Sequence, residues 1–181
     1  MEISSTAVKE LREKTGAGVM DCKKALQEAN GDFDRAVAVL RERGAMLLAK
    51  KLDREANQGI IDTYIHAGGR IGAMVELNCE TDFVARTDDF RALAHDIAMQ
   101  VAAMSPKYVR PDEVADGDSE AEHVLLTQAF IKDPKRTIEQ LIHEGVAKLG
   151  ENIQIRRFVR FEVGAPLPGA TPAGGDGANA G

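Results

Sequence analysis

The sequence contains no tryptophan, and aromatic residues make up only 4% of its 181 residues. A core built from this chain must therefore rest on leucine, isoleucine, valine, alanine and methionine. The apolar fraction of 44% is ordinary for a globular protein, so a core of fair size can form. The length suits one domain, or one domain with a small satellite.

The features of secreted and membrane-spanning proteins are also missing. The two cysteines, Cys22 and Cys79, cannot form a disulfide framework and have no histidine nearby at ligand spacing. No uninterrupted apolar run approaches the length of a membrane span, and residues 1–4 lack the basic-then-apolar pattern of a signal peptide. These absences predict a cytoplasmic protein with reduced thiols and no membrane association.

Positive charge is scarce as well. The net charge of −6 argues against a nucleic-acid binder, which usually presents a basic face. The four histidines show no paired spacing, and the chain has no metal-binding spacing, nucleophile elbow or glycine-rich dinucleotide turn. We therefore expect no metal, no cofactor and no direct contact with nucleic acid, and an enzyme interpretation has little support.

Residues 1–44 are predicted to form three short helices. Ser4 is a suitable N-cap for the first helix, and Asp32 is a suitable N-cap for the third. Gly44 is expected to end the third helix, so that residues 45–58 form a separate connecting helix. A compact unit of this kind resembles the ubiquitin-associated type of three-helix fold.

The periodicity changes to that of β-strands after residue 59. Alternation at Ile61, Thr63 and Ile65 is followed by a glycine turn and by alternation over residues 71–79. This pattern predicts a β-hairpin with one buried face.

Helices and a final strand complete the predicted core over residues 59–163. A strong helical period covers residues 90–101, residues 120–130 begin as a helix, and a capping box opens a helix over residues 137–149. The last strand is predicted from alternating apolar residues, namely Ile153, Ile155, Val159, Phe161 and Val163. The fold class is therefore α+β, with a three-stranded antiparallel sheet packed against helices. Residues 164–181, rich in glycine, proline and alanine, are predicted to be disordered.

The stretch between the hairpin and the next helix places a carboxylate beside an aromatic ring, at Asp82 and Phe83. Local chemistry alone favours an aspartate that caps a turn and a phenylalanine that packs into the core. Cys79 falls on the buried side of its strand, so a small structural residue is favoured over a nucleophile. For Met20 two roles stay open, a core gap-filler or an exposed contact for a partner helix.

Three motifs, taken in order, resemble those of the translation elongation factor Ts family. They are TGAGVMDCKKAL at residues 15–26, NCETDFVA at residues 78–85, and GENI followed by RRFVRFEV within residues 150–163. The similarity extends over about residues 2–163. Each motif alone could arise by chance, but the ordered set is specific.

The resemblance implies a guanine nucleotide exchange factor for elongation factor Tu in bacterial-type translation elongation. Such a factor binds the GDP form of Tu, perturbs its Mg²⁺ and phosphate site, releases GDP and stabilises the empty partner until GTP binds. The residues implied in dislocating Mg²⁺ from Tu are Thr81, Asp82, Phe83 and Val84. Phe83 is implied as a wedge that shifts partner helices, and Asp82 as the group that disturbs the magnesium-water network.

The resemblance also implies contacts between the N-terminal module and the partner, at Arg12, Met20 and Lys23. The chain is too short for the second half-core and the coiled-coil excursion of longer members. Because a half-core tends to leave an apolar sheet face uncovered, we predict a homodimer and an assembly of two factor chains with two Tu chains. The protein is expected to act by binding and not as an enzyme.

Two other functions stay open from the residues alone. An adaptor that recognises a peptide or ubiquitin-like partner needs only residues 1–44 and leaves residues 81–84 without a role. A small thiol-dependent enzyme uses Cys79 with a histidine and predicts that alkylation of the thiols abolishes activity.

Overall fold

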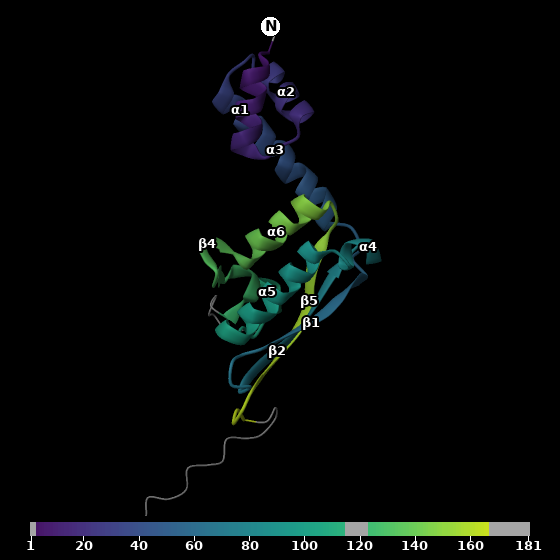
Figure 1. The fold of residues 1–181 in the computed structure, drawn as a ribbon, viewed down its shortest axis with the longest axis vertical. Helices are drawn as coiled ribbons and strands as arrows, with labels where there is room; N and C mark the ends of the chain where they lie inside the picture. The colour runs from purple at the N-terminus through teal and green to yellow at the C-terminus, as the bar shows by residue number, and fades with distance from the viewer. Residues whose placement is uncertain (1–2, 115–122, 167–181) are drawn as a thin grey trace, which may run out of the picture.

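The structure, a computed structural model, describes residues 3–114 and 123–166. Three N-terminal helices precede a core in which helices cover one face of a three-stranded antiparallel sheet (Figure 1). The α+β class predicted from the sequence is therefore confirmed. The predicted disordered tail lies outside the described residues from residue 167 onward.

The N-terminal module has a small core of its own. Its helices are α1 (Ser5–Thr15), α2 (Val19–Glu28) and the first half of α3 (Phe33–Leu52). The side chains of Ser4 and Asp32 cap α1 and α3 as predicted, and Gly16 closes α1 in the left-handed region at φ 69°. The buried residues of this module are Leu11, Cys22, Ala25, Leu26, Ala29, Ala36 and Val37.

The predicted end of the third helix at Gly44 is wrong. α3 continues through Gly44 to Leu52, so the separate connecting helix is in fact its second half. A glycine weakens a helix interior by about 1 kcal/mol relative to alanine, which tertiary packing readily overrides. Here that packing acts at both ends of the helix, because Leu40 packs against the module core and Leu48 packs against the sheet core.

The main core lies between the sheet and two long helices. The strands are β1 (Gln58–Ile65), β2 (Ile71–Cys79) and β5 (Ile153–Glu162), with β2 in the centre and every pairing antiparallel. The helices that cover the sheet are α5 (Asp88–Met104) and α6 (Ile138–Leu149) (Figure 1). The predicted capping box of Thr137 and Gln140 is present at the start of α6, and Gly150 ends that helix at φ 82°.

In β1 the predicted buried face is wrong. Ile61, Thr63 and Ile65 point to the open side of the sheet, whereas Ile60 and Tyr64 pack toward the helices. The register explains the reversal, because residues directly opposite in an antiparallel pair share one face. Ile60 lies opposite a buried leucine of β2 and Tyr64 lies opposite a buried alanine.

In β5 the predicted alternation holds only for its first part. Ile153 and Ile155 are buried, but a β-bulge leaves Arg156 without a partner residue on β2. One extra residue moves every later side chain to the opposite face. Val159 and Phe161 are therefore 42% and 72% exposed instead of buried. Together with β1 and β2 they form the open sheet face, made of Ile61, Ile65, Met74, Val159 and Phe161.

The described residues between α5 and α6 contain little helix. The described part contains the 3₁₀ turns η1 (Pro111–Glu113) and η3 (Leu125–Thr127) and a small hairpin of β3 (Ala129–Phe130) and β4 (Asp133–Thr137). The helix predicted to begin near residue 120 starts outside the described residues, and where the chain is described again it forms η3 and β3. The buried amide of Gln100 holds this hairpin, since it donates to Ala129 O at 3.1 Å and accepts from Ile131 N at 3.0 Å.

Candidate functional site

The stretch after β2 forms a single helical turn, α4 (Asp82–Ala85). The Thr81 hydroxyl accepts a hydrogen bond from Val84 N at 3.4 Å and so caps this turn. The Thr87 hydroxyl caps α5 in the same way, through Phe90 N at 3.3 Å. Two threonine caps six residues apart thus break the chain into a short turn followed by a long helix.

Phe83 points outward from α4 and is 78% exposed. This exposure excludes the core role that local chemistry favoured. Asp82 is not the cap, because Thr81 fills that role, and its carboxylate instead pairs with Arg86 at 2.7 Å. Both partners are about half or more exposed, and pairs of this kind contribute only about 0.3–0.5 kcal/mol. A binding partner can therefore displace Arg86 from the Asp82 carboxylate at a small cost in free energy.

Two other side chains fasten the turn to the core. Val84 packs against the main core, and Ala85 is buried.

Cys79 is fully buried at the end of β2, where its thiol donates to Thr81 O at 3.1 Å. Burial, helped by the negative charge of Glu151, raises the pKa of the Cys79 thiol to about 11. The thiol is therefore un-ionised at neutral pH, which argues against a thiol-dependent enzyme.

Glu151 and Asn152, which received no role from the sequence pattern, hold the base of α4. The Glu151 carboxylate accepts from Thr81 Oγ1 at 2.6 Å and from Thr81 N at 3.0 Å. The Asn152 backbone N–H donates to Glu80 at 2.7 Å. These partners lie about 70 residues apart in the chain, so no local periodicity could have revealed them. The only sequence signal was their position inside the third family motif.

The N-terminal residues implied by the resemblance all lie in α1 and α2 of the module. Met20 is 61% exposed, which favours the contact role over the gap-filling role. Arg12 and Lys23 line the same hollow of about 320 Å³ between α1 and α2. The complete lining is Ile3, Ser5, Val8, Lys9, Arg12, Val19 and Lys23. An apolar floor edged by cations is suited to an acidic, amphipathic partner surface.

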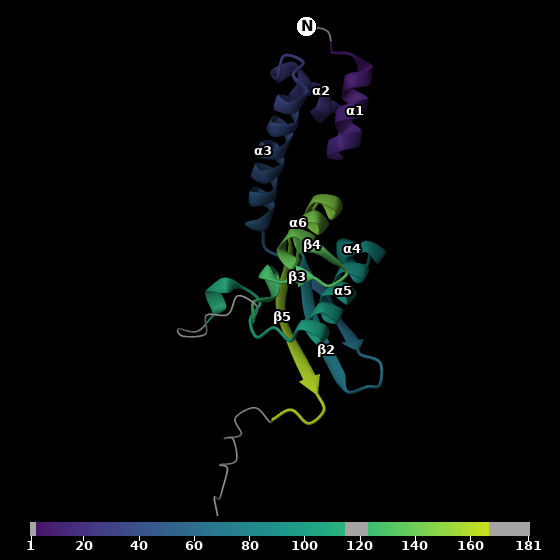
Figure 2. The same ribbon diagram turned by 90° about the vertical axis from the view of Figure 1, so that its left-hand side faces the viewer.

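The two groups of implied residues lie at opposite ends of α3. The α4 turn belongs to the core, which lies beyond the C-terminal end of α3, and the module surrounds the N-terminal half of that helix (Figure 1). In Figure 2, α1 and α4 lie toward the same side of the molecule, one above the other. The structure thus separates the four residues of the turn from the three residues of the module, and we call these two groups the candidate contact regions.

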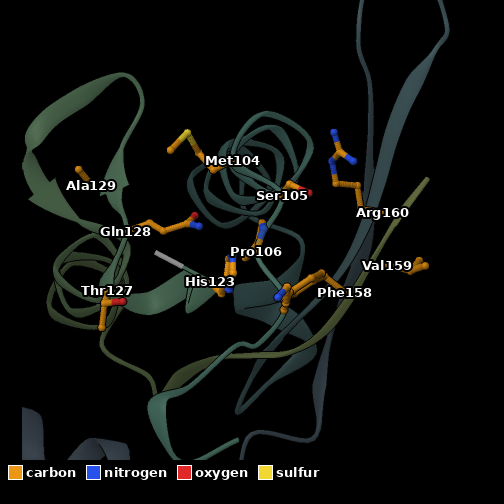
Figure 3. A pocket seen from close by; sticks show the side chains of 11 residues that line it. Met104, Ser105, Pro106, His123, Thr127, Gln128, Ala129, Phe158, Val159 and Arg160 are labelled. Carbon is orange, nitrogen blue, oxygen red and sulfur yellow. The ribbon is translucent and has the colours of Figure 1, made fainter. Parts of the chain in front are cut away.

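A pocket of about 880 Å³ lies away from both regions, between the end of α5, η3 and β5 (Figure 3). Its walls include Met104, Phe158 and Arg160. The Arg160 guanidinium already donates to Ala102 O at 3.0 Å and pairs with Glu162 at 2.7 Å. We assign this pocket no role.

Among residues 3–114 and 123–166, no group of three or more histidine, cysteine or acidic side chains is placed to hold a metal ion. The helices of this same part of the chain are all too short or too polar to cross a lipid bilayer.

The fold and the two candidate contact regions define a class of α+β protein with a small helical module and an exposed aspartate–phenylalanine turn. The sequence model of the family described as Elongation factor TS matches residues 2–123 and 117–165. The chain therefore belongs to the elongation factor Ts family, and its role is in translation elongation.

Curated relatives carry the name Elongation factor Ts. The one from Thermoanaerobacter pseudethanolicus is 50% identical, with 90% of this chain and 95% of the relative covered. The one from Carboxydothermus hydrogenoformans is 49% identical, with 91% of each covered. The one from Herpetosiphon aurantiacus is 47% identical, with 91% of this chain and all of the relative covered.

Proposed function

We propose that this protein is the guanine nucleotide exchange factor for elongation factor Tu and that it works in the cytoplasm. It binds Tu·GDP, promotes release of GDP and holds the empty partner until GTP binds. The observation that carries this proposal is the presentation of Phe83, whose ring is 78% exposed on a turn that is anchored on both sides. An exposed aromatic on a rigid base is the typical form of a binding hot spot.

Exchange of this kind requires no bond to be made or broken by the factor. A protein can displace a nucleotide only by binding the empty partner more tightly than the nucleotide-bound partner, and the coupling is reciprocal. Phe83 acts as the wedge that separates partner elements near the nucleotide. In the complex, the Asp82 carboxylate leaves Arg86 and contacts groups around the Mg²⁺ and water network of the partner. It need not bind the ion itself. Thr81 and Val84 keep the turn in shape.

The N-terminal surface supplies the second contact with Tu. Met20 provides an exposed apolar group, and Arg12 and Lys23 provide positive charge beside it. This region accounts for affinity and orientation, whereas the α4 turn accounts for nucleotide release. The division explains why the chain carries more than the module alone, which the adaptor hypothesis does not explain.

The test is release of fluorescent GDP from elongation factor Tu in a stopped-flow experiment. Wild-type protein is expected to accelerate release strongly. Burying a side chain that is 78% exposed stabilises a complex by about 2–4 kcal/mol, so Phe83→Ala should slow release by about 30-fold to 900-fold. Leu47→Ala is the matched control, because it removes another apolar side chain that is 60% exposed, on α3. Absence of acceleration by the wild type would refute the proposal.

We also propose that the protein is a homodimer formed through the open sheet face. Two of the five apolar side chains on this face, Ile65 and Phe161, are 65% and 72% exposed, and they surround a hollow of about 420 Å³. A contiguous apolar sheet face of this kind is normally covered by a partner. Two such faces packed together complete a sandwich, and each copy can then engage one Tu chain in a two-plus-two assembly.

Light scattering at micromolar concentration tests the dimer directly. Wild-type protein should have the mass of two chains, and Phe161→Lys should have the mass of one, because the ammonium group would be buried without a partner. Ile131→Lys, on the loop of the β3–β4 hairpin, is the control and should remain a dimer. A wild-type monomer under these conditions contradicts the proposal.

A further inference from the structure

The end of α3, the start of α4 and the turn before β5 meet in a polar cluster. The cluster consists of Glu80, Thr81, Glu151, Asn152 and the C-terminal end of α3, and we name it the hinge clamp. Asn152 connects its parts, because its Nδ2 donates to Leu52 O at 3.1 Å and to Arg54 O at 2.5 Å. Its backbone N–H donates to Glu80, and its neighbour Glu151 holds Thr81 by two hydrogen bonds.

In the described part of the chain, the hinge clamp contains a buried polar atom without a hydrogen bond, which is unusual for a contact that only stabilises the fold. Asn152 is fully buried, and its Oδ1 makes no hydrogen bond within the described structure. The orientation of the amide is fixed, because only the NH₂ group can satisfy two facing carbonyls. A buried polar atom without a partner costs free energy, and such costs are tolerated mainly where the group has a function. The function visible here is the attachment of α3 to the turn that carries Phe83.

This attachment lies between the two contact regions. α3 carries the N-terminal module, and its last carbonyl groups are held by Asn152. α4 carries Phe83, and its cap Thr81 is held by Glu151, the adjacent residue. Two neighbouring residues, Glu151 and Asn152, thus connect the helix that carries the module with the turn that carries the wedge, and they belong to neither contact region.

We propose that Glu151 and Asn152 are positioning residues that fix the wedge relative to the N-terminal module, so that a chain bound through the module places Phe83 correctly. The inference rests on the proposed exchange function and assigns it two residues that do not touch the partner. A functional group must be held within a fraction of an ångström by residues behind it, and a displacement of about 1 Å can reduce a rate 100-fold.

The experiment measures fluorescent GDP release from elongation factor Tu as a function of factor concentration. The variants are Glu151→Ala, Phe83→Ala and their combination. Glu151→Ala should lower the maximal release rate by at least about tenfold, because the wedge is misplaced even in the saturated complex. Adding Glu151→Ala to Phe83→Ala should then slow release by less than about a further twofold, because the two residues act as a unit. Glu151→Gln, which keeps one acceptor oxygen, should lie between Glu151→Ala and wild type.

A merely structural role gives a different pattern. Loss of folded protein lowers only the effective concentration of the factor, so it raises the concentration needed for half-maximal release and leaves the maximal rate unchanged. Glu144→Ala is the matched control, because it removes a glutamate from α6 that pairs with Arg136 and lies outside the clamp. Amide exchange at Thr81 and Val84, measured without the partner, should increase in Glu151→Ala and remain unchanged in Glu144→Ala.

The outcomes separate this inference from the function on which it rests. If wild-type protein does not accelerate GDP release, the exchange function fails and the inference fails with it. If the wild type accelerates release and Glu151→Ala reaches the same maximal rate, only the inference is overturned. Multiplicative effects of Glu151→Ala and Phe83→Ala would overturn it as well.

Discussion

Replacing Gly44 by alanine gives a measurement whose sign tests the course of α3. The sequence favoured a helix end at Gly44, whereas the structure places it inside a continuous helix. A Cβ added at Gly44 would meet no atom within 4 Å, and its backbone is not in the left-handed region. Alanine should therefore stabilise the protein by the difference in helix propensity, about 1 kcal/mol.

The alternative predicts the opposite sign. At a helix end closed by a left-handed glycine, alanine costs about 1–2 kcal/mol. Gly145 provides a matched control, because it also lies inside a helix, α6, and takes the same substitution. A Cβ at Gly145 would lie 2.9 Å from Leu93 Cδ2 and 3.3 Å from Ile153 Cδ1, so crowding of the core outweighs the gain in propensity.

Urea denaturation followed by circular dichroism measures both effects. Gly44→Ala should raise the midpoint, and a thermal scan should show an increase of about 2–4 °C. Gly145→Ala should lower both. A loss of stability of about 1 kcal/mol or more in Gly44→Ala would refute the continuous helix. Nucleotide exchange should be unchanged in Gly44→Ala, because a helix that is already continuous does not change its course.

Cys79, Leu11 and Thr137 give the remaining predictions. Burial raises the pKa of Cys79 to about 11, so folded protein should leave this thiol unreactive toward iodoacetamide at pH 8, and mass spectrometry should find it modified only after unfolding. The pKa of this thiol in the folded protein lies above its ordinary value of 9.0. Its contribution to the free energy of unfolding is therefore complete below pH 9 and is lost as the pH rises toward 11. Denaturant titrations at several pH values across that range measure this loss. Leu11→Ala, at a fully buried site of the N-terminal module, should cost about 2–5 kcal/mol and raise the factor concentration needed for half-maximal exchange. Thr137→Ala removes the capping box of α6 and should cost about 0.5–2 kcal/mol in urea denaturation.

The helix boundaries that were predicted correctly depend on neighbouring residues. Ser4, Asp32 and Thr137 begin helices through bonds that span three residues, and Gly16 and Gly150 end helices through their own backbone angles. The wrong boundary, at Gly44, depended on what lies at the two ends of a long helix. The reversed face of β1 depended on its register with β2. Contacts between distant parts of the chain decided both of these outcomes.

The same distinction applies to the candidate site. Motifs in the sequence predicted that Asp82 and Phe83 lie in a functional turn. The structure adds that Phe83 is exposed and that Thr81 is the N-cap of that turn. The residues behind the turn could not be found in this way. Glu151 reaches Thr81 across 70 positions of the chain, and a contact of that range has no signature in local periodicity.

The bulge at Arg156 changes how mutations along β5 should be tolerated. Arg156 and its neighbour Arg157 both pair with Glu76, so the extra residue is held in place by a shared carboxylate. Before the bulge the odd-numbered positions are buried, and after it the inward positions are even-numbered, beginning with Phe158. Polar substitutions along the strand should therefore destabilise the protein at odd-numbered positions before Arg156 and at even-numbered positions after it. A deletion of that arginine would remove the bulge but leave the faces of the second half of β5 unchanged, because Arg157 would follow Ile155 directly and would still lie opposite Glu76.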